Sequence, residues 1–164
     1  MSDQDQAVQQ AKRLIEQNIY AAIATADSAG RPWNSPVFVV YDDELNFYWA
    51  SGVKSQHSQN IHENSHIFLV LFDSTVEWGK GEGVYIQARA KELTNLADIT
   101  KACKLRYQRQ PKANQSPSDF TGVLPRRVYR AVPEHIWING DAMHKGYFVD
   151  GRYEVDLAAL RAAR

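Results

Sequence analysis

Short β-rich segments separated by turn residues dominate the first half of this 164-residue chain. Residues 19–27 read IYAAIATAD and are followed by the turn sequence SAGRP. Residues 35–51 read SPVFVVYDDELNFYWAS, which is two β-rich runs joined at DDE. Such a succession is typical of antiparallel sheets. The segment is therefore predicted to form a meander of antiparallel strands.

Three later segments extend the predicted sheet. Residues 66–72, HIFLVLF, are apolar almost throughout, which predicts a strand covered on both faces. Residues 83–93, GVYIQARAKEL, alternate between apolar and polar side chains, which predicts one core face and one polar face. Residues 126–138, RRVYRAVPEHIWI, predict a strand with an offset at Pro133. The resulting fold class is mostly β, a small antiparallel barrel with peripheral α-helices.

Amphipathic helices are expected around this barrel. Residues 4–17 carry apolar side chains at helical spacing, namely Val8, Ala11, Leu14 and Ile15. A second helix is expected after Asn95 as its cap, with a stripe made of Leu96, Ile99, Cys103 and Tyr107. An exposed loop is expected over residues 109–119. The whole chain, residues 1–164, is predicted to be a single domain with a barrel core over 19–138 and a C-terminal extension over 139–164.

Charge and cysteine content exclude several classes of protein. Lys plus Arg and Asp plus Glu each number 19, so no broad field attracts nucleic acid or anionic lipid. The single cysteine, Cys103, is expected to be a packed thiol in a reducing compartment. No secretory signal is recognised at the N-terminus, and the apolar run 67–72 is too short to cross a bilayer. A cytoplasmic protein without a membrane or nucleic-acid partner is predicted.

Residues 49–64, WASGVKSQHSQNIHEN, contain the most suggestive chemistry in the chain. A strand is expected to end at Ala50, and a short helix to begin near Ser55. The free N–H groups of that helix start would be surrounded by Lys54, His57 and the hydroxyls of Ser51, Ser55 and Ser58, which together suit a phosphate. In the alternative interpretation, Ser55 only caps a surface helix and the neighbouring side chains are solvated.

Other motifs indicate no second chemistry. His57, His62 and His66 are not spaced to share one face, so no metal site is predicted. The glycine-rich segment 79–83, GKGEG, precedes a strand and is expected to be a flexible loop. No set of serine, histidine and aspartate suggests a protein nucleophile. Of the four tryptophans, Trp137 is the candidate for stacking on a ring.

The chain resembles the pyridoxamine 5'-phosphate oxidase-like FMN-binding split barrels, and within them the general stress protein type. The resemblance rests on four segments in order, over residues 19–138: AAIATADSAGRPWNSPVFVVYDDELNFYWAS, KSQHSQNIHENSHIFLVLFDS, GEGVYIQARAKEL and RVYRAVPEHIWI. It implies an antiparallel split β-barrel and a homodimer with FMN near the subunit interface. The C-terminal sequence does not match the element that recognises the substrate phosphate in pyridoxamine phosphate oxidases, so vitamin B6 oxidation is not expected.

The resemblance also assigns parts of the cofactor to residues. The isoalloxazine ring would lie against the strand that contains residues 35–38. The ribityl chain would run along the edge of the strand that contains residues 49–51. The phosphate would be held at the following turn by Lys54, Ser55 and His57. The polar edge of the ring would lie near Gln87. With the ring-stacking candidate added, the candidate cofactor-binding residues are Ser35, Pro36, Val37, Phe38, Trp49, Ala50, Ser51, Lys54, Ser55, His57, Gln87 and Trp137.

Three functions follow from this resemblance. The first is a flavin-dependent oxidoreductase or flavin reductase that acts on a small-molecule redox substrate, with the redox chemistry supplied by the flavin. The second is a flavin-binding stress or sensor protein without turnover. The third keeps the barrel but uses deazaflavin or haem in place of FMN.

Overall fold

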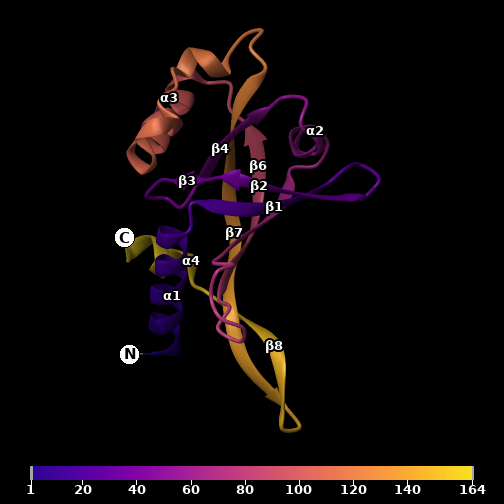
Figure 1. The fold of residues 1–164 in the computed structure, drawn as a ribbon, viewed down its shortest axis with the longest axis vertical. Helices are drawn as coiled ribbons and strands as arrows, with labels where there is room; N and C mark the ends of the chain where they lie inside the picture. The colour runs from indigo at the N-terminus through magenta and orange to yellow at the C-terminus, as the bar shows by residue number, and fades with distance from the viewer. Residues whose placement is uncertain (1, 164) are drawn as a thin grey trace.

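The computed structural model describes residues 2–163, with the side chains of all of these except 141–144 and 148. In chain order (Figure 1) the elements are α1 (Asp3–Gln17), β1 (Tyr20–Ala26), β2 (Pro32–Phe38), β3 (Val40–Tyr41), β4 (Phe47–Gly52), α2 (Gln56–Glu63), β5 (His66–Phe72), β6 (Gly83–Glu92), α3 (Leu96–Arg109), the 3-10 turns η1 (Pro111–Ala113) and η2 (Pro117–Phe120), β7 (Arg126–His144), β8 (Tyr147–Glu154) and α4 (Leu157–Ala162).

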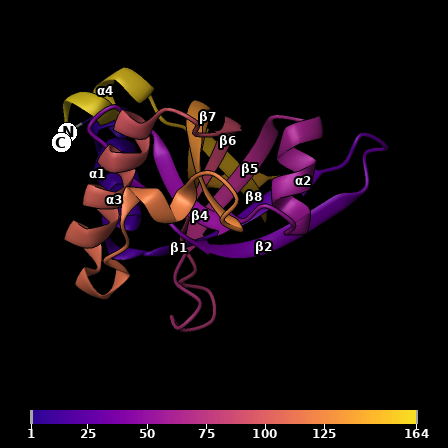
Figure 2. The same ribbon diagram turned by 90° about the horizontal axis from the view of Figure 1, so that it is seen from above.

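One antiparallel sheet contains the eight strands. Its order is β2-β1-β5-β6-β7-β4-β3, and β8 pairs with β7. The sheet curls into an open barrel with β2 and β3 at the ends of this path, and the helices lie outside or across its openings (Figures 1 and 2). The predicted mostly β fold, an antiparallel split barrel with peripheral helices, is therefore confirmed.

Helix α1 closes the apolar interior of the sheet. Its predicted apolar positions are all buried, as is Ala7. They join a core that includes Ile23 of β1, Leu69 of β5 and Ile86 of β6. Helix α4 packs on α1, so both described ends of the chain lie on the same side of the molecule (Figure 2).

The two central strands differ in how well the sequence predicts their faces. The alternation expected in β6 is observed, with Ile86 buried and Arg89 exposed. The sequence predicts that strand β5 is covered on both faces, but within one chain only its inner face is covered. Phe68 and Val70 are only half-buried, and Phe72 is 50% exposed. The outer face of this strand is apolar because of its sequence, yet no element of the same chain covers it fully.

Strand β7 is 19 residues long and pairs successively with β4, β6 and β8. Pro133 pairs with Ala88 and His135 pairs with Gln87, so Glu134 is an extra residue at a bulge. The predicted offset at Pro133 is confirmed. The strand continues past residue 138 without a break, and with β8 it forms a hairpin that extends beyond the barrel (Figure 1).

Helix α3 covers a second apolar cluster on the outside of the sheet. Ile99 and Cys103 are buried there, and Cys103 is a free thiol, as predicted. The predicted stripe is wrong at both ends, because Leu96 and Tyr107 are at least half exposed. The expected loop after α3 contains η1 and η2, and η2 buries Phe120 against the same cluster.

Candidate functional site

The turn between β4 and α2 leaves the start of the helix without a side-chain cap. Ser55 occupies the N-cap position, but its hydroxyl donates to the carbonyl of Gly52 at 2.8 Å and does not cap the helix. The alternative in which Ser55 caps α2 through its side chain therefore differs from the structure. The first N–H groups of α2 remain suited to an anion.

A buried imidazole ties three serines to this turn. His57 is 8% exposed, and its Nε2 lies 2.7 Å from Oγ of Ser51 and 3.2 Å from Oγ of Ser55. Its Nδ1 lies 3.2 Å from Oγ of Ser35 on β2. Burial lowers the pKa of His57, so the neutral ring accepts one hydroxyl proton and donates to another hydroxyl. His57 therefore positions the serines rather than supplying a positive charge.

The positive charge at the turn comes from Lys54. This residue is exposed, and its ammonium forms no ion pair with any described residue. Its backbone carbonyl accepts a hydrogen bond from Gln59 at 2.8 Å, which fixes the turn. An unpaired ammonium beside uncapped helix N–H groups is a suitable anion-binding arrangement.

Several polar residues that the sequence did not identify continue this site along α2 and the neighbouring strands. Gln56 donates to Asn60 at 2.8 Å, and Asn60 donates to Thr25 of β1 at 3.0 Å. Trp33 donates through its indole nitrogen to Ser35 at 3.0 Å. A hollow of about 280 Å³ lies beside them, lined by Asp27, Arg31, Pro32, Trp33, Gln56 and Asn60. The available signal was the polar character of α2 on the face that packs against the sheet.

The remaining residues of β2 and β4 lie in other environments. Val37 and Trp49 point into the core, where the Trp49 ring stacks on Tyr129 at 5.7 Å. A ligand could reach them only through their backbone. Phe38 and Ala50 face outward and pack against the cluster beneath α3, whereas Pro36 is exposed.

Gln87 and Trp137 belong to an aromatic ladder on the outer face of the sheet. The Trp137 ring stacks on Phe68 at 6.3 Å and on His135 at 5.5 Å. Gln87 is the register partner of both Phe68 and His135. His135 Nδ1 lies 2.7 Å from Oε1 of Glu154, which orients the imidazole.

Strand register separates this ladder from the turn. Ser35 pairs with Ile23, which is in the core, so its side chain faces the inside of the sheet. Gln87 lies between the inward-facing Ile86 and Ala88, so its side chain faces outward. Within one chain the structure therefore brings together Ser35, Ser51, Lys54, Ser55 and His57. It does not bring Gln87 and Trp137 to them.

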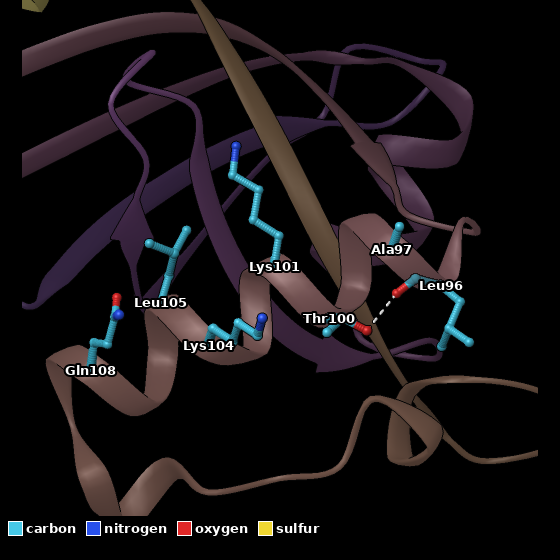
Figure 3. Close-up of a pocket in the computed structure, with 7 residues that line it drawn as sticks. All are labelled: Leu96, Ala97, Thr100, Lys101, Lys104, Leu105 and Gln108. Carbon is cyan, nitrogen blue, oxygen red and sulfur yellow. Dashed lines mark hydrogen bonds between the residues drawn. The ribbon is translucent and has the colours of Figure 1, made fainter.

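A larger hollow of about 610 Å³ follows the exposed side of α3 (Figure 3). It is lined by Leu96, Ala97, Thr100, Lys101, Lys104, Leu105 and Gln108. Lys101 is bound to Asp42 at 2.6 Å, and Thr100 donates to the Leu96 carbonyl at 2.8 Å. The hollow is a shallow helix surface without a nucleophile or acid–base pair.

Metal-ligand clusters and membrane-spanning helices are both absent from the described part of the chain. No three His, Cys, Asp or Glu side chains there are placed to hold a metal ion. Among the same residues, no helix has the length and apolar character needed to span a membrane.

Comparison with known families identifies the barrel. A family model described as pyridoxamine 5'-phosphate oxidase matches residues 7–139, which is most of the chain. The chain belongs to this family. The match includes the turn at Lys54, the outer ladder and the bulge in β7. No curated protein shows significant similarity to the chain.

Solved structures share the fold at low sequence identity. A protein of unknown function from Agrobacterium tumefaciens str. C58 is 19% identical with a TM-score of 0.69, over 87% of this chain and 60% of that protein. HutZ, a heme storage protein from Vibrio cholerae, is 17% identical with a TM-score of 0.61, over 75% of this chain and 87% of that protein. A heme-binding protein from Mycobacterium smegmatis is 12% identical with a TM-score of 0.69, over 94% of this chain and 60% of that protein. The chain thus spans about three fifths of the Agrobacterium and Mycobacterium proteins.

Proposed function

We propose that the protein binds FMN and acts as a flavin-dependent oxidoreductase or flavin reductase. The observation that carries this proposal is the turn at Lys54. It combines an unpaired ammonium with a helix start that has no side-chain cap, and a buried imidazole holds the surrounding hydroxyls. This arrangement suits the phosphate of FMN, because the Lys54 ammonium and the free N–H groups of the helix start can both donate hydrogen bonds to an anion.

The flavin ring requires a second surface. The Gln87 amide forms no hydrogen bond with a described residue, so both its oxygen and its nitrogen remain available to the polar edge of a ring. Trp137 and Phe68 offer flat apolar surface beside it. Because this surface and the turn lie on different faces of one chain, we propose a homodimer in which the turn of one protomer meets the outer face of its partner.

FMN, when bound, supplies the electron transfer itself. The chain contributes binding and orientation: Lys54 and the helix start hold the phosphate, and His57 fixes the rotamers of Ser35 and Ser51. The aromatic ladder excludes water from one side of the ring. The buried single thiol is consistent with a cytoplasmic protein, which forms part of the proposal.

Binding of FMN and riboflavin to a Lys54→Ala variant tests the proposal. Loss of one charge-assisted contact of about 1.5 to 3 kcal/mol should weaken FMN roughly tenfold to more than a hundredfold. Riboflavin lacks the phosphate and should bind both proteins equally. Lys104→Ala, another exposed lysine, is the matched control. Unchanged FMN affinity in Lys54→Ala, or an equal loss for both ligands, would contradict the phosphate site.

Turnover separates an enzyme from a storage or sensor protein. An oxidoreductase should let reduced nicotinamide bleach the bound flavin, and an added acceptor should restore its colour over repeated cycles. Tight FMN binding without turnover across a broad panel of donors and acceptors would favour the flavin-binding stress or sensor function.

Haem is a second candidate ligand because of His135. Its imidazole is exposed, and Glu154 holds Nδ1 at 2.7 Å, which leaves Nε2 available as an iron ligand. Trp137 and Phe68 provide flat apolar contacts beside it. Haem titration should then give a Soret band that shifts in His135→Ala but not in His66→Ala. The visible spectrum also distinguishes deazaflavin from FMN and haem.

A further inference from the structure

Two arginine side chains on the outer side of β7 lack an anionic partner. Arg106 of α3 is only 6% exposed, yet its buried Nε has no hydrogen-bond partner among the described residues. Its single side-chain hydrogen bond is a long one of 3.4 Å to Gln115. Arg126 of β7 forms no side-chain hydrogen bond or ion pair with a described residue.

Both guanidinium groups are held in place by aromatic rings of one region. Arg106 lies 5.3 Å from the centre of the Phe38 ring, and Arg126 lies 5.7 Å from that of Phe120. Phe120 belongs to the cluster beneath α3, and Phe38 packs against the same cluster. Burial lowers the pKa of Arg106, and so does the positive charge of Arg126. Both guanidinium groups therefore lie over the same apolar cluster beneath α3.

A purely structural role explains only part of this arrangement. Arg106 lies in the last turn of α3, where the helix dipole favours a cation, and the ring of Phe38 adds a cation–π contact. Neither interaction supplies an acceptor for the N–H groups of the two forks. A buried guanidinium such as that of Arg106, with a second cation at the half-buried Arg126 of the same region, is costly without an anion beside it.

We propose that Arg106 and Arg126 form an anion-binding site for a phosphate or carboxylate group. The guanidinium fork matches both anions through paired hydrogen bonds. Arg126 pairs with Gly52, and the Val53 N–H donates to the Pro125 carbonyl at 2.9 Å, so the site adjoins the turn that carries Lys54. The anion is either a free one or the phosphate of a flavin, and the inference does not require that flavin binds.

Thermal unfolding in phosphate and in chloride, at equal ionic strength, tests the site. At a phosphate concentration about tenfold above its dissociation constant, the melting temperature of the wild-type protein should rise by about 3 to 6 °C. Arg126→Met and Arg106→Met should lose most of this shift, whereas Lys104→Met on α3 should keep it. Arg106→Met should also melt at a higher temperature than wild type in chloride, because it removes an unpaired buried charge.

The same variants identify the source of the anion. If Arg126→Met weakens FMN but not riboflavin, the site holds the flavin phosphate. If it leaves both flavins unchanged but loses the phosphate shift, the site holds a free anion. A wild-type protein that binds no FMN but shows an arginine-dependent phosphate shift would refute the proposed function and support this site. Equal phosphate shifts in wild type and both arginine variants would overturn the inference.

Discussion

At the scale of single residues, the buried imidazole of His57 makes the stability of the protein depend on pH. Burial lowers the pKa of His57 from its ordinary 6.5, so below about pH 6.5 the unfolded chain binds a proton that the folded chain does not. The stabilising contribution is complete above pH 6.5 and decreases as the pH falls, by up to about 1.4 kcal/mol per pH unit. Urea unfolding between pH 7.5 and 5 should show this slope.

His57→Gln should flatten that slope because it removes the titrating group. At pH 7.5 the variant should be about 1 to 2 kcal/mol less stable, since Gln replaces the ring's hydrogen bonds incompletely. His66→Gln, at an exposed position, should keep the wild-type slope. Identical pH dependence in His57→Gln and the wild-type protein would show that folding does not shift the pKa of His57.

Asp42 should stabilise the protein in the opposite chemical sense, as an ionised carboxylate. Burial raises the pKa of Asp42, but hydrogen bonds from Lys101, Asn46 and Tyr48 outweigh burial and bring the pKa below its ordinary value. The contribution is therefore present above about pH 4 and disappears as the pH falls through the folded pKa. Asp42→Asn should cost about 1 to 3 kcal/mol at pH 7, and this cost should shrink as the pH is lowered below 4.

The exposed neighbour Asp43 provides the matched control for this measurement. Asp43→Asn should change the urea midpoint little at pH 7 or below pH 4. An equal effect of the two substitutions would mean that the contact between Lys101 and Asp42 does not stabilise the fold.

The placement of single residues was predictable where they lie close together in the sequence. Lys54, Ser55 and His57 are close in the chain, so their shared turn was predictable. The contribution of Ser35 depends on strand register and on the packing of α2 over the sheet, which spacing does not reveal. The sequence around Trp49 is apolar on both sides of the strand, so it could not show that this ring faces the core.

At the scale of elements, α4 should contribute to the core rather than to a surface extension. Leu160 is fully buried, and α4 packs on α1. Leu160→Ala should therefore cost about 2 to 5 kcal/mol of unfolding free energy. Val123→Ala, on a fully exposed loop residue, should stay within about 0.5 kcal/mol of wild type. Similar midpoints for the two variants in urea would show that α4 is not part of the cooperative unit.

Element types were predictable because alternation and turn residues are local signals. It was harder to predict which faces of each element are buried by the rest of the protein. Strand β5 has the composition of a strand buried on both faces, but composition cannot say whether its second face meets the same chain or another molecule. The stripe of α3 was misjudged for a related reason: Leu96 lies in the first turn, beyond the part of the helix that contacts the sheet.

At the scale of the whole molecule, the uncovered outer face should be a dimer interface. Tyr20 and Phe72 are at least half exposed there, next to the half-buried Val70 and Trp137. Apolar surface of this kind is typical of contacts between subunits. Light scattering should give twice the 18.6 kDa chain mass.

Phe72→Asp should shift this equilibrium toward the monomer without unfolding it, because the side chain is already half exposed in one chain. Val123→Asp adds the same charge on an exposed loop and should leave the dimer intact. A wild-type monomer at micromolar concentration with FMN bound would contradict the dimer, and a dimer unaffected by Phe72→Asp would place the interface elsewhere.

The length and position of β7 also affect how the protein is made. Strand β4 cannot complete its pairing until β7 has been synthesised, because Trp49 pairs with Tyr129, which lies 80 positions later in the chain. At a synthesis rate of about 5 to 20 residues per second, the first strands leave the ribosome roughly 5 to 15 s before their closing strand. During that interval the inner face of a half-built sheet is open to solvent. Chaperone demand should therefore depend on the translation speed between β4 and β7, and a slow stretch there should increase aggregation of the nascent chain.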